Sequence, residues 1–236
     1  MLEAINLSKS YGSHKALSSL NLKVSTGEVF CLLGANGAGK TTTINLFMGF
    51  ISPSDGQVKV NDLDVASQAE ESKQHLAYIP ENLTLYPNLT GIENLDFFCG
   101  LAGKEYSKSN LEELLKQSGL QSDFIHKRVS HYSKGMRQKV GIALARARDA
   151  KALLLDEPTS GLDPKASNEF SELLQDMKER GVATLMATHD LFRAKEIGTH
   201  IGIMKEGELK HLLTTASLSL SELESLYLDT MKLQPA

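Results

Sequence analysis

The chain has 236 residues and a formal net charge of −4. It is long enough for one large domain or two small ones, and its charge argues against a general attraction to nucleic acid or to an anionic membrane surface. The sequence has two cysteines, no signal peptide and no window of the roughly 20 apolar residues that span a membrane. We therefore expect a soluble protein of a reducing cytoplasm, and any membrane role would come through a partner.

Two strands are expected near the N-terminus, over residues 2–7 and 20–24, the second with clear alternation of apolar and polar residues. Tyr11 lies between them and has two interpretations. It could offer a stacking face to an adenine ring, or it could be a turn aromatic that packs on a small sheet. Because Tyr is commonly half-buried, the residue alone favours the second interpretation.

The stretch from Glu28 to Thr43 carries the strongest motif of the chain. Val29–Leu33 is an unbroken apolar run, as a strand buried on both faces requires. The sequence GANGAGKT at 34–41 then fits a phosphate-binding loop, in which glycines let backbone N–H groups approach a polyphosphate and tolerate positive φ. An ordinary glycine-rich turn would explain the glycines, but it would not explain the apolar strand and the helix pattern on either side.

A helix beginning near Lys40 would direct the positive end of its dipole at the phosphates. Lys40 can neutralise the β- and γ-phosphates, and the hydroxyl of Thr41 can bind Mg²⁺. We expect the nucleotide to contact Gly34, Ala35, Asn36, Gly37, Ala38, Gly39, Lys40, Thr41 and Thr42.

Two further strands are expected at 57–60 and 76–79. Pro80 ends the second strand, and Glu81 follows it at the start of a loop over 82–88.

Helix signals take over from Thr90 onward. Thr90-x-x-Glu93 is a capping-box pattern, and Ser109-x-x-Glu112 repeats it before a second helix. We therefore expect a mostly helical subdomain over residues 82–149, inserted into an α/β core.

A third helix is expected to begin near Ser133-Lys134-Gly135. A helix N-terminus with a Ser hydroxyl and a Gly backbone N–H can bind an anion. Since the chain has one phosphate loop, this second site could serve the nucleotide of another copy. N-capping by Ser133 explains the residue equally well, so the residues alone leave both interpretations open.

Two carboxylates end the buried strand expected at 152–155. In an open parallel sheet, ligands bind at the carboxyl edge of the strands. Asp156 could hold Mg²⁺, directly or through water, and Glu157 could orient and deprotonate the attacking water. Adjacent carboxylates are more often a solvated strand end. The phosphate loop, however, predicts an acidic partner on a neighbouring strand, and we therefore favour the functional interpretation.

His189 follows the strand expected at 182–187, at the same edge of the sheet. A neutral imidazole there could contact the γ-phosphate and sense its loss, although a lone His is more often structural. Farther along, Glu206-Gly207 indicates a hairpin, and helix-spaced leucines over 217–231 indicate a tail that packs back on the core.

In their order along nearly the whole chain, these motifs resemble those of the ATP-binding subunit of an ABC transporter. In that resemblance, Tyr11 matches the adenine-stacking aromatic and residues 34–41 match Walker A. Glu81 falls at the Q-loop position, where the family has a Gln that senses the γ-phosphate and the metal.

The second half of the chain continues the resemblance. Residues 132–136 fall at the signature motif, which contains Ser133 and Gly135, and 153–157 match Walker B with its catalytic Glu. Residues 160–163 match the D-loop, and His189 matches the switch histidine.

Two residues depart from the family pattern. Glu81 keeps an oxygen ligand but adds a negative charge at the metal sensor, and Lys134 adds a cation near the expected γ-phosphate of a partner subunit. The segments 80–90 and 133–138 resemble those of bacterial exporter-type ATPases of multidrug and antibiotic efflux systems.

The resemblance implies a P-loop NTPase fold, an α/β core with an N-terminal antiparallel β subdomain. The core would span 1–81 and 150–215, with the helical subdomain at 82–149 and a helical tail at 216–236. It also implies a head-to-tail dimer, a homodimer or a paralogue heterodimer, that sandwiches two ATP molecules and binds Mg²⁺. A polytopic membrane permease would hold this cytoplasmic protein at the inner face of the cell membrane.

The alternative function is that of a soluble ABC-type ATPase acting on ribosomes or DNA. Such proteins typically carry a long coiled-coil insertion or two ATPase units, and this sequence has neither. Their partners also favour a basic surface, which the composition of this sequence does not predict. A P-loop GTPase would need an Asn-Lys-x-Asp motif, which is absent, and a non-catalytic nucleotide-binding module conflicts with an intact Glu157.

Overall fold

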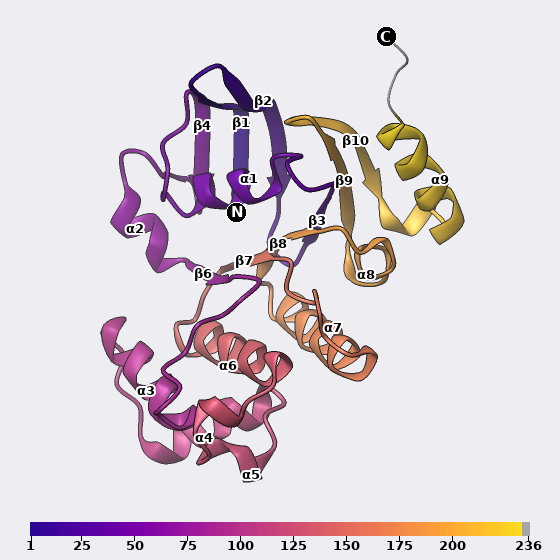
Figure 1. Cartoon of the computed structure of the whole chain (residues 1–236). Coiled ribbons are helices and arrows are strands. Elements are labelled where there is room, and N and C mark those ends of the chain that lie inside the picture. The colour runs from indigo at the N-terminus through magenta and orange to yellow at the C-terminus, as the bar shows by residue number, and fades with distance from the viewer. Residues whose placement is uncertain (233–236) are drawn as a thin grey trace.

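The structure, a computed structural model, describes residues 1–232. Its strands form two sheets, and its helices lie on the faces of the larger sheet and in a separate helical region (Figure 1). The end of the expected tail, residues 233–236, lies outside the described residues. No helix in the described part combines the length and the hydropathy of a bilayer-spanning segment.

The smaller sheet is antiparallel, with strand order β2-β1-β4-β5. Its strands are β1 (Leu2–Tyr11), β2 (His14–Val24), β4 (Asp55–Val60) and β5 (Leu63–Asp64). The expected strands 2–7 and 20–24 are therefore parts of one longer hairpin that ends where Tyr11 pairs with His14. The hairpin extends beyond the alternating apolar residues because its backbone pairing continues through polar positions such as Ser10.

The larger sheet has strand order β10-β9-β3-β8-β7-β6, and every neighbouring pair except β9–β10 is parallel. Its strands are β3 (Val29–Leu33), β6 (Leu76–Ile79), β7 (Ala152–Asp156), β8 (Ala183–Thr188), β9 (His200–Lys205) and β10 (Glu208–Thr214). The expected hairpin is confirmed between β9 and β10, where Glu206 and Gly207 have φ of 52° and 79°, as a two-residue hairpin turn requires.

One expectation about this sheet is wrong: the acidic strand β7 is not a neighbour of the phosphate-loop strand β3. β8 lies between them and pairs in parallel with both. The physical reason is the crossover after β7, which runs through a helix and returns the chain between two strands that are already present. The carboxyl ends of β3, β8 and β7 still meet at one edge.

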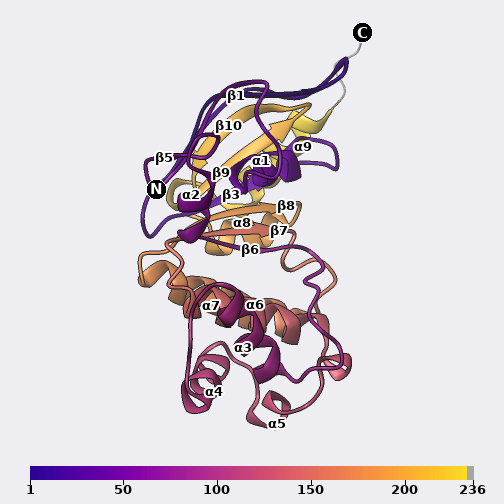
Figure 2. The ribbon, with the colours of Figure 1, turned by 90° about the vertical axis from the view of Figure 1, so that its left-hand side faces the viewer.

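The helices occupy three places. α1 (Lys40–Phe47) lies between the two sheets, and α2 (Ala69–Gln74) precedes β6. The opposite face of the larger sheet is covered by α7 (Pro164–Glu179), α8 (Leu191–Ile197) and α9 (Leu220–Met231). The helical region, below that face in Figure 2, contains α3 (Gly91–Leu101), α4 (Lys108–Gln117), α5 (Ser122–Ile125) and α6 (Lys134–Ala147), with a short 3₁₀ turn at Val129–His131. Outside this region, a second 3₁₀ turn follows β10 at Thr215–Ser217.

Side-chain caps define most helix starts. The capping box of Thr90 and Glu93 is confirmed. The box expected at Ser109 is wrong, because Ser107 caps α4 by accepting a hydrogen bond from the Asn110 N–H at 3.3 Å. The hydroxyl of Ser109 instead lies 2.9 Å from that of Ser107, so the helix begins before the predicted box.

In the part of the chain that the structure describes, three apolar clusters form the core. Two of them cover the two faces of the larger sheet, and the third lies within the helical region. Cys31 and Cys99 are buried and free, as expected, and burial raises the pKa of both thiols, that of Cys99 to about 11.

Within residues 1–232, two ion pairs join α6, in the helical region, to α7. Lys139 Nζ on α6 lies 2.5 Å from Glu169 Oε2 on α7, and Arg146 Nη2 lies 2.5 Å from Asp176 Oδ2. Both cations are largely buried, so these contacts are better protected from solvent screening than ordinary surface pairs.

Candidate active site

The phosphate loop connects β3 to α1. Gly39 is the N-cap of α1, and no side chain caps this helix. The N–H groups of the first turn therefore stay available to an external acceptor, and the helix dipole favours an anion there.

Close packing explains two of the loop glycines. A Cβ on Gly39 would lie 2.8 Å from the Ala16 carbonyl oxygen of β2, and Gly39 has φ of 104°. A Cβ on Gly34 would lie 2.7 Å from the Met204 carbonyl oxygen of β9. Gly34 is thus required for close backbone approach rather than for positive φ, whereas Gly37 and Gly39 have positive φ as expected.

Lys40 links the loop to the end of β7. Its side chain is 6% exposed, and its Nζ donates a hydrogen bond to the Gly34 carbonyl at 2.6 Å. The same nitrogen lies 3.4 Å from Oε1 of Glu157. A phosphate group entering the loop therefore meets a buried cation whose present counter-ion is a carboxylate of the same site.

Thr41 and Asp156 lie together at the carboxyl edge of the larger sheet. The Thr41 hydroxyl donates a hydrogen bond to Asp156 Oδ1 at 3.3 Å. Burial raises the pKa of Asp156 and the charges of Glu157 and Glu81 act in the same direction, whereas the Thr41 hydrogen bond and the charge of Lys40 lower it.

This pair fits a magnesium ion. A hydroxyl and a buried carboxylate are hard oxygen ligands, and Mg²⁺ in proteins usually takes one or two such groups together with waters and substrate phosphates. Within residues 1–232, no group of three or more His, Cys, Asp or Glu side chains could hold a metal by itself, so the donor set suits a cation that arrives with phosphate.

The backbone of Glu157 is strained, and its two carboxylate oxygens make different contacts. Its φ of 47° lies in the left-handed region, which costs a non-glycine residue free energy and is typical of functional sites. Oε2 lies 2.8 Å from His189 Nδ1. Oε1 is buried and has no hydrogen-bond partner among residues 1–232, where its one close contact is the ion pair with Lys40. Oε2 is thus held by His189, while Oε1 faces only the Lys40 ammonium.

Glu81 and Lys134, the two departures from the family pattern, contact each other. Lys134 Nζ lies 3.8 Å from Glu81 Oε1, and the Ser160 hydroxyl donates to the same oxygen at 3.1 Å. The loop after β6, the loop after β7 and the start of α6 therefore meet at one carboxylate.

Other predicted residues lie apart from this cluster. Tyr11 is at the end of β1, 49% exposed, with the Lys9 ammonium 5.2 Å from its ring centre. Ser133 caps α6 by accepting a hydrogen bond from the Met136 N–H at 3.2 Å. Among residues 1–232, no hydrogen bond or ion pair joins Ser133 or Gly135 to the phosphate loop.

Sequence reasoning missed Gln138. This α6 side chain is fully buried, and its Nε2 lies 3.4 Å from the carbonyl oxygens of Pro80, Glu81 and Pro158. It thereby holds the loops after β6 and β7 against α6. Gln138 and Val140 are two residues apart and lie on different sides of α6, so no apolar stripe in the sequence pointed to Gln138.

Comparison with known proteins gives a consistent result. The sequence matches the family profile described as "ABC transporter" over residues 17–160. The bacitracin transport ATP-binding protein BcrA of Bacillus licheniformis is 36% identical over 210 residues, which cover 89% of this chain and 68% of BcrA. The probable multidrug ABC transporter ATP-binding protein YbhF of Escherichia coli is 35% identical over 89% of this chain and 36% of YbhF.

One of the similar solved structures is a dimer. The dimeric structure of the ATP-binding cassette MJ0796, in a post-hydrolysis state bound to ADP and Pi, has a TM-score of 0.81 and 26% identity. The match covers 91% of this chain and 99% of that one.

Proposed function

Because this chain belongs to the ABC transporter family of ATP-binding proteins, we propose that it is the ATPase subunit of a membrane exporter. In this proposal ATP closes a head-to-tail dimer, and hydrolysis reopens it. The observation that carries the proposal is the meeting of Lys40, Glu157 and His189 at the edge where β3, β7 and β8 end. The relatives named for bacitracin transport and for multidrug transport support the exporter assignment.

The hydrolytic step follows from the contacts of Glu157. An incoming γ-phosphate would take Lys40 from Glu157, because a phosphate carries more negative charge than a carboxylate. Glu157 Oε1 would then be free to orient a water and accept its proton, while His189 keeps Oε2 in place. Thr41 and Asp156, with Glu81 nearby, would hold Mg²⁺, which would neutralise phosphate charge.

The dimer is inferred from residues that do not meet their own phosphate loop. Ser133 and Gly135 begin α6, and a second copy facing head-to-tail could present them to the γ-phosphate. Tyr11 would stack on the adenine ring. The dimeric cassette with ADP and Pi supports this arrangement, and the second copy would be either the same chain or a paralogue.

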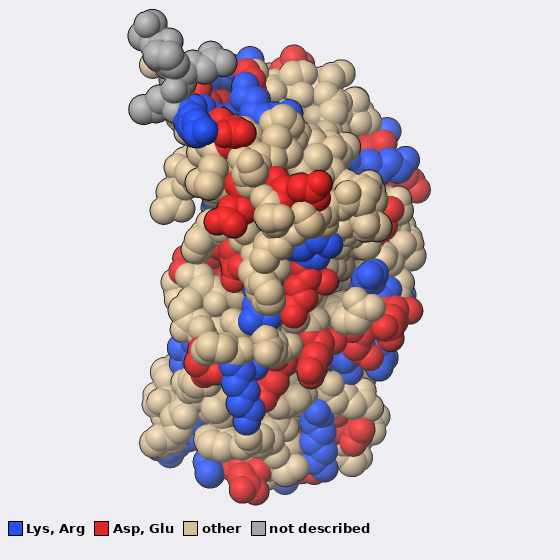
Figure 3. Space-filling view, turned by 90° about the vertical axis from the view of Figure 1, so that its right-hand side faces the viewer, with Lys and Arg blue, Asp and Glu red and all other residues tan. Residues whose placement is uncertain are grey.

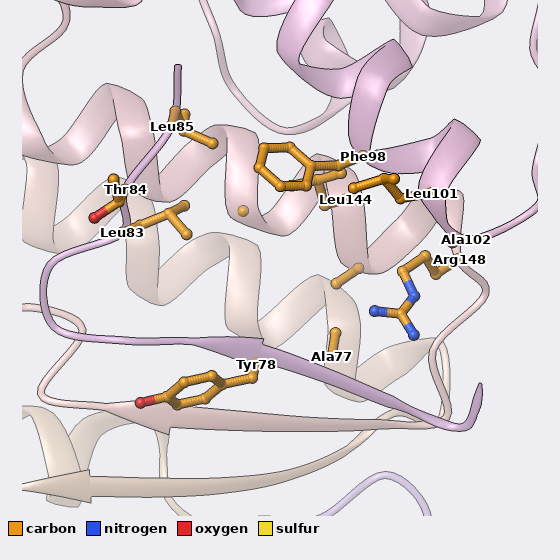
Figure 4. Close-up of a pocket in the computed structure, with 12 residues that line it drawn as sticks. Ala77, Tyr78, Leu83, Thr84, Leu85, Phe98, Leu101, Ala102, Leu144 and Arg148 are labelled. Atoms are coloured by element: carbon orange, nitrogen blue, oxygen red, sulfur yellow. The ribbon is translucent and has the colours of Figure 1, made fainter. Parts of the chain in front are cut away.

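A groove beside the helical region is our candidate for the permease contact. It has a volume of about 320 Å³ and lies between β6, the loop after β6, α3 and α6 (Figure 4). Its lining is largely apolar, including Leu83, Phe98 and Leu144, and Arg148 supplies a cation. An amphipathic cytoplasmic helix of a polytopic permease would fit it, with the apolar face inward and an acidic residue toward Arg148.

This contact would keep the protein at the inner face of the cell membrane. We further propose that residues 82–149 move as a unit against a core formed by 1–81 and 150–215, with 216–236 as a tail. Closure of the ATPase dimer would then move the permease helix in the groove.

The ribosome or DNA alternative is not favoured. The formal net charge is −4, and on the face shown in Figure 3 acidic and basic side chains are interspersed rather than gathered into a basic area. The relatives described above are transport or transporter ATP-binding proteins by name.

The test is an affinity pull-down from detergent-solubilised membranes of the native host. The tagged wild-type protein should recover a polytopic membrane protein in near-stoichiometric amount. Leu101→Asp, at the rim of the groove, should lose it, whereas Leu212→Asp, at another exposed leucine, on β10, should keep it. Recovery of only ribosomal or nucleic-acid-bound proteins would contradict the exporter proposal, and equal recovery by both variants would contradict the groove.

A further inference from the structure

A strained backbone conformation marks the turn after β7. Glu157 has φ of 47°, in the left-handed region, which a non-glycine residue keeps only where its surroundings fix it. β8 fixes one side of the turn, because the Glu157 N–H donates a hydrogen bond to the Ala187 carbonyl at 2.9 Å. The turn adds a second bond, from the Ser160 N–H to the Glu157 carbonyl at 3.2 Å. These two bonds fix Glu157 itself and leave the next residue, Pro158, to other contacts.

The contact that holds Pro158 comes from the helical region. Pro158 is buried, and its carbonyl oxygen lies 3.4 Å from Nε2 of Gln138 on α6. Within residues 1–232, no other group donates a hydrogen bond to this carbonyl. A buried carbonyl without a donor is unfavourable, so loss of the Gln138 amide would favour a shift of the turn toward water or toward another donor.

The carboxamide of Gln138 is poorly placed for stability alone. Its two N–H groups are shared among three carbonyl oxygens, those of Pro80, Glu81 and Pro158, each 3.4 Å from Nε2. Its Oε1 is buried and has no hydrogen-bond partner among residues 1–232. Asn94, another buried amide of the helical region, makes three hydrogen bonds of 2.8, 2.9 and 3.0 Å. An incompletely paired buried amide calls for an explanation other than stability.

A small shift of the turn would matter for the proposed base. In the proposed cycle, Lys40 leaves Glu157 for the incoming phosphate. The direction of Oε1 then depends on the contact of Oε2 to His189 and on the backbone of Glu157. A displacement of about 1 Å between reacting groups can cost about 10²-fold in rate. The group that fixes this backbone from α6 therefore has leverage on hydrolysis.

We propose that Gln138 is a positioning residue for ATP hydrolysis. From α6 it holds the Pro158 carbonyl, and it thereby keeps Glu157 in the left-handed conformation from which Oε1 takes a proton from water. The inference rests on the proposed function, in which Glu157 is the base. Through this one amide, the position of α6 controls the rate of the chemical step and leaves the affinity for the nucleotide unchanged.

The experiment compares Gln138→Met with the wild type, at a temperature where thermal unfolding shows every variant to be folded. Methionine keeps an unbranched side chain of similar length and removes the amide. The affinity for a fluorescent ATP analogue should stay within about twofold, whereas kcat should fall about 10–100-fold. In the Glu157→Gln background, Gln138→Met should slow single-turnover hydrolysis by less than about twofold, because the base through which Gln138 acts is already absent.

A second variant and a control complete the test. Gln138→Asn keeps an amide but is shorter by one methylene, and it should show the same pattern even if the apolar variant does not fold. The control, Asn94→Leu, removes a buried amide that does not touch the turn after β7. It should lower the melting temperature more than Gln138→Met does, because the hydrogen bonds it loses are shorter, and it should leave kcat unchanged.

A purely structural role for Gln138 predicts that its variants lower hydrolysis equally in the wild-type and Glu157→Gln backgrounds, or weaken nucleotide binding as much as kcat. Either result would overturn the inference, and so would wild-type kcat in both Gln138 variants. A wild-type protein that hydrolyses no ATP, or that loses no activity on Glu157→Gln, would instead contradict the proposed function.

Discussion

Lys40 Nζ and Glu157 Oε1 form an ion pair 3.4 Å long between the phosphate loop and the end of β7, and both side chains are largely buried. The proposed phosphate-binding cation and the proposed catalytic base therefore neutralise each other in the absence of nucleotide. Nucleotide binding has to separate them, which places Lys40 on the phosphate and frees the base in one event.

Glu157→Gln should reduce ATP turnover by about 10²–10⁴-fold, the usual contribution of a positioned general base. Its isosteric amide keeps the contact to His189 but cannot take a proton from water. The ATP-bound dimer should then accumulate, as seen by sedimentation with ATP. Glu224→Gln, on the outer side of α9, is the control, and wild-type hydrolysis rates in Glu157→Gln would exclude Glu157 as the base.

The Lys40–Glu157 pair should also be visible in stability. Lys40→Ala leaves a buried carboxylate without its counter-ion and should cost about 1–3 kcal/mol in the free energy of unfolding. Combining it with Glu157→Gln should recover part of that cost, because the uncompensated charge is gone. Chemical denaturation of the wild type, the single variants and the double variant measures this coupling. Strict additivity would mean that the two side chains do not interact.

Asp156→Asn should raise the melting temperature of the nucleotide-free protein at pH 7. Burial raises the pKa of Asp156 in the folded state, so ionisation of this group opposes folding. The penalty is absent below the pKa of the unfolded chain, grows as pH rises toward the folded pKa, and is complete above it. Thermal unfolding from pH 3 to pH 8 should show the gain at neutral pH and its loss in acid.

Asp156→Asn should also abolish the gain in ATP affinity that Mg²⁺ provides, measured by the binding of a fluorescent ATP analogue. A variant that is more stable yet deficient in Mg²⁺-dependent binding would be the expected mark of a binding residue. Loss of both stability and binding would indicate a structural role instead.

The two cysteines should report unfolding. Cys31 and Cys99 are buried, and their raised pKa values keep both as unreactive thiols at neutral pH. A maleimide reagent at pH 7 should label neither in the folded protein and both after denaturation in guanidinium. Rapid labelling of Cys99 alone would reveal local opening of the helical region.

Much of the fold follows from local sequence pattern. The unbroken apolar strands, the capping box at Thr90 and the turn at Glu206-Gly207 are short-range signals, and the structure confirms them. The extent of the β1–β2 hairpin is not predictable in this way because polar residues continue its pairing. The insertion of β8 between β3 and β7 depends on crossover topology, which no local pattern encodes.

The site divides in the same way. Sequence motifs identified the residues of the phosphate loop and of the strand ends, and the chain brings Lys40, Glu157 and His189 together. The strained φ of Glu157 and the bridging position of Gln138 arise from contacts between segments far apart in the sequence. The pairing of Glu81 with Lys134 was equally invisible, since the sequence identified each departure separately.

The ion pairs between α6 and α7 join the two helices at two separate points. Lys139 and Arg146 are about two turns apart on α6, and their partners Glu169 and Asp176 are equally spaced on α7. Two attachments at separate points resist rotation of one helix against the other better than one does, and they act together with the Gln138 contacts of α6. If the helical region twists in the proposed cycle, these contacts pass the twist to α7. From α7 it reaches the strands that precede and follow this helix in the chain, β7 and β8, whose carboxyl ends lie at Asp156 and just before His189.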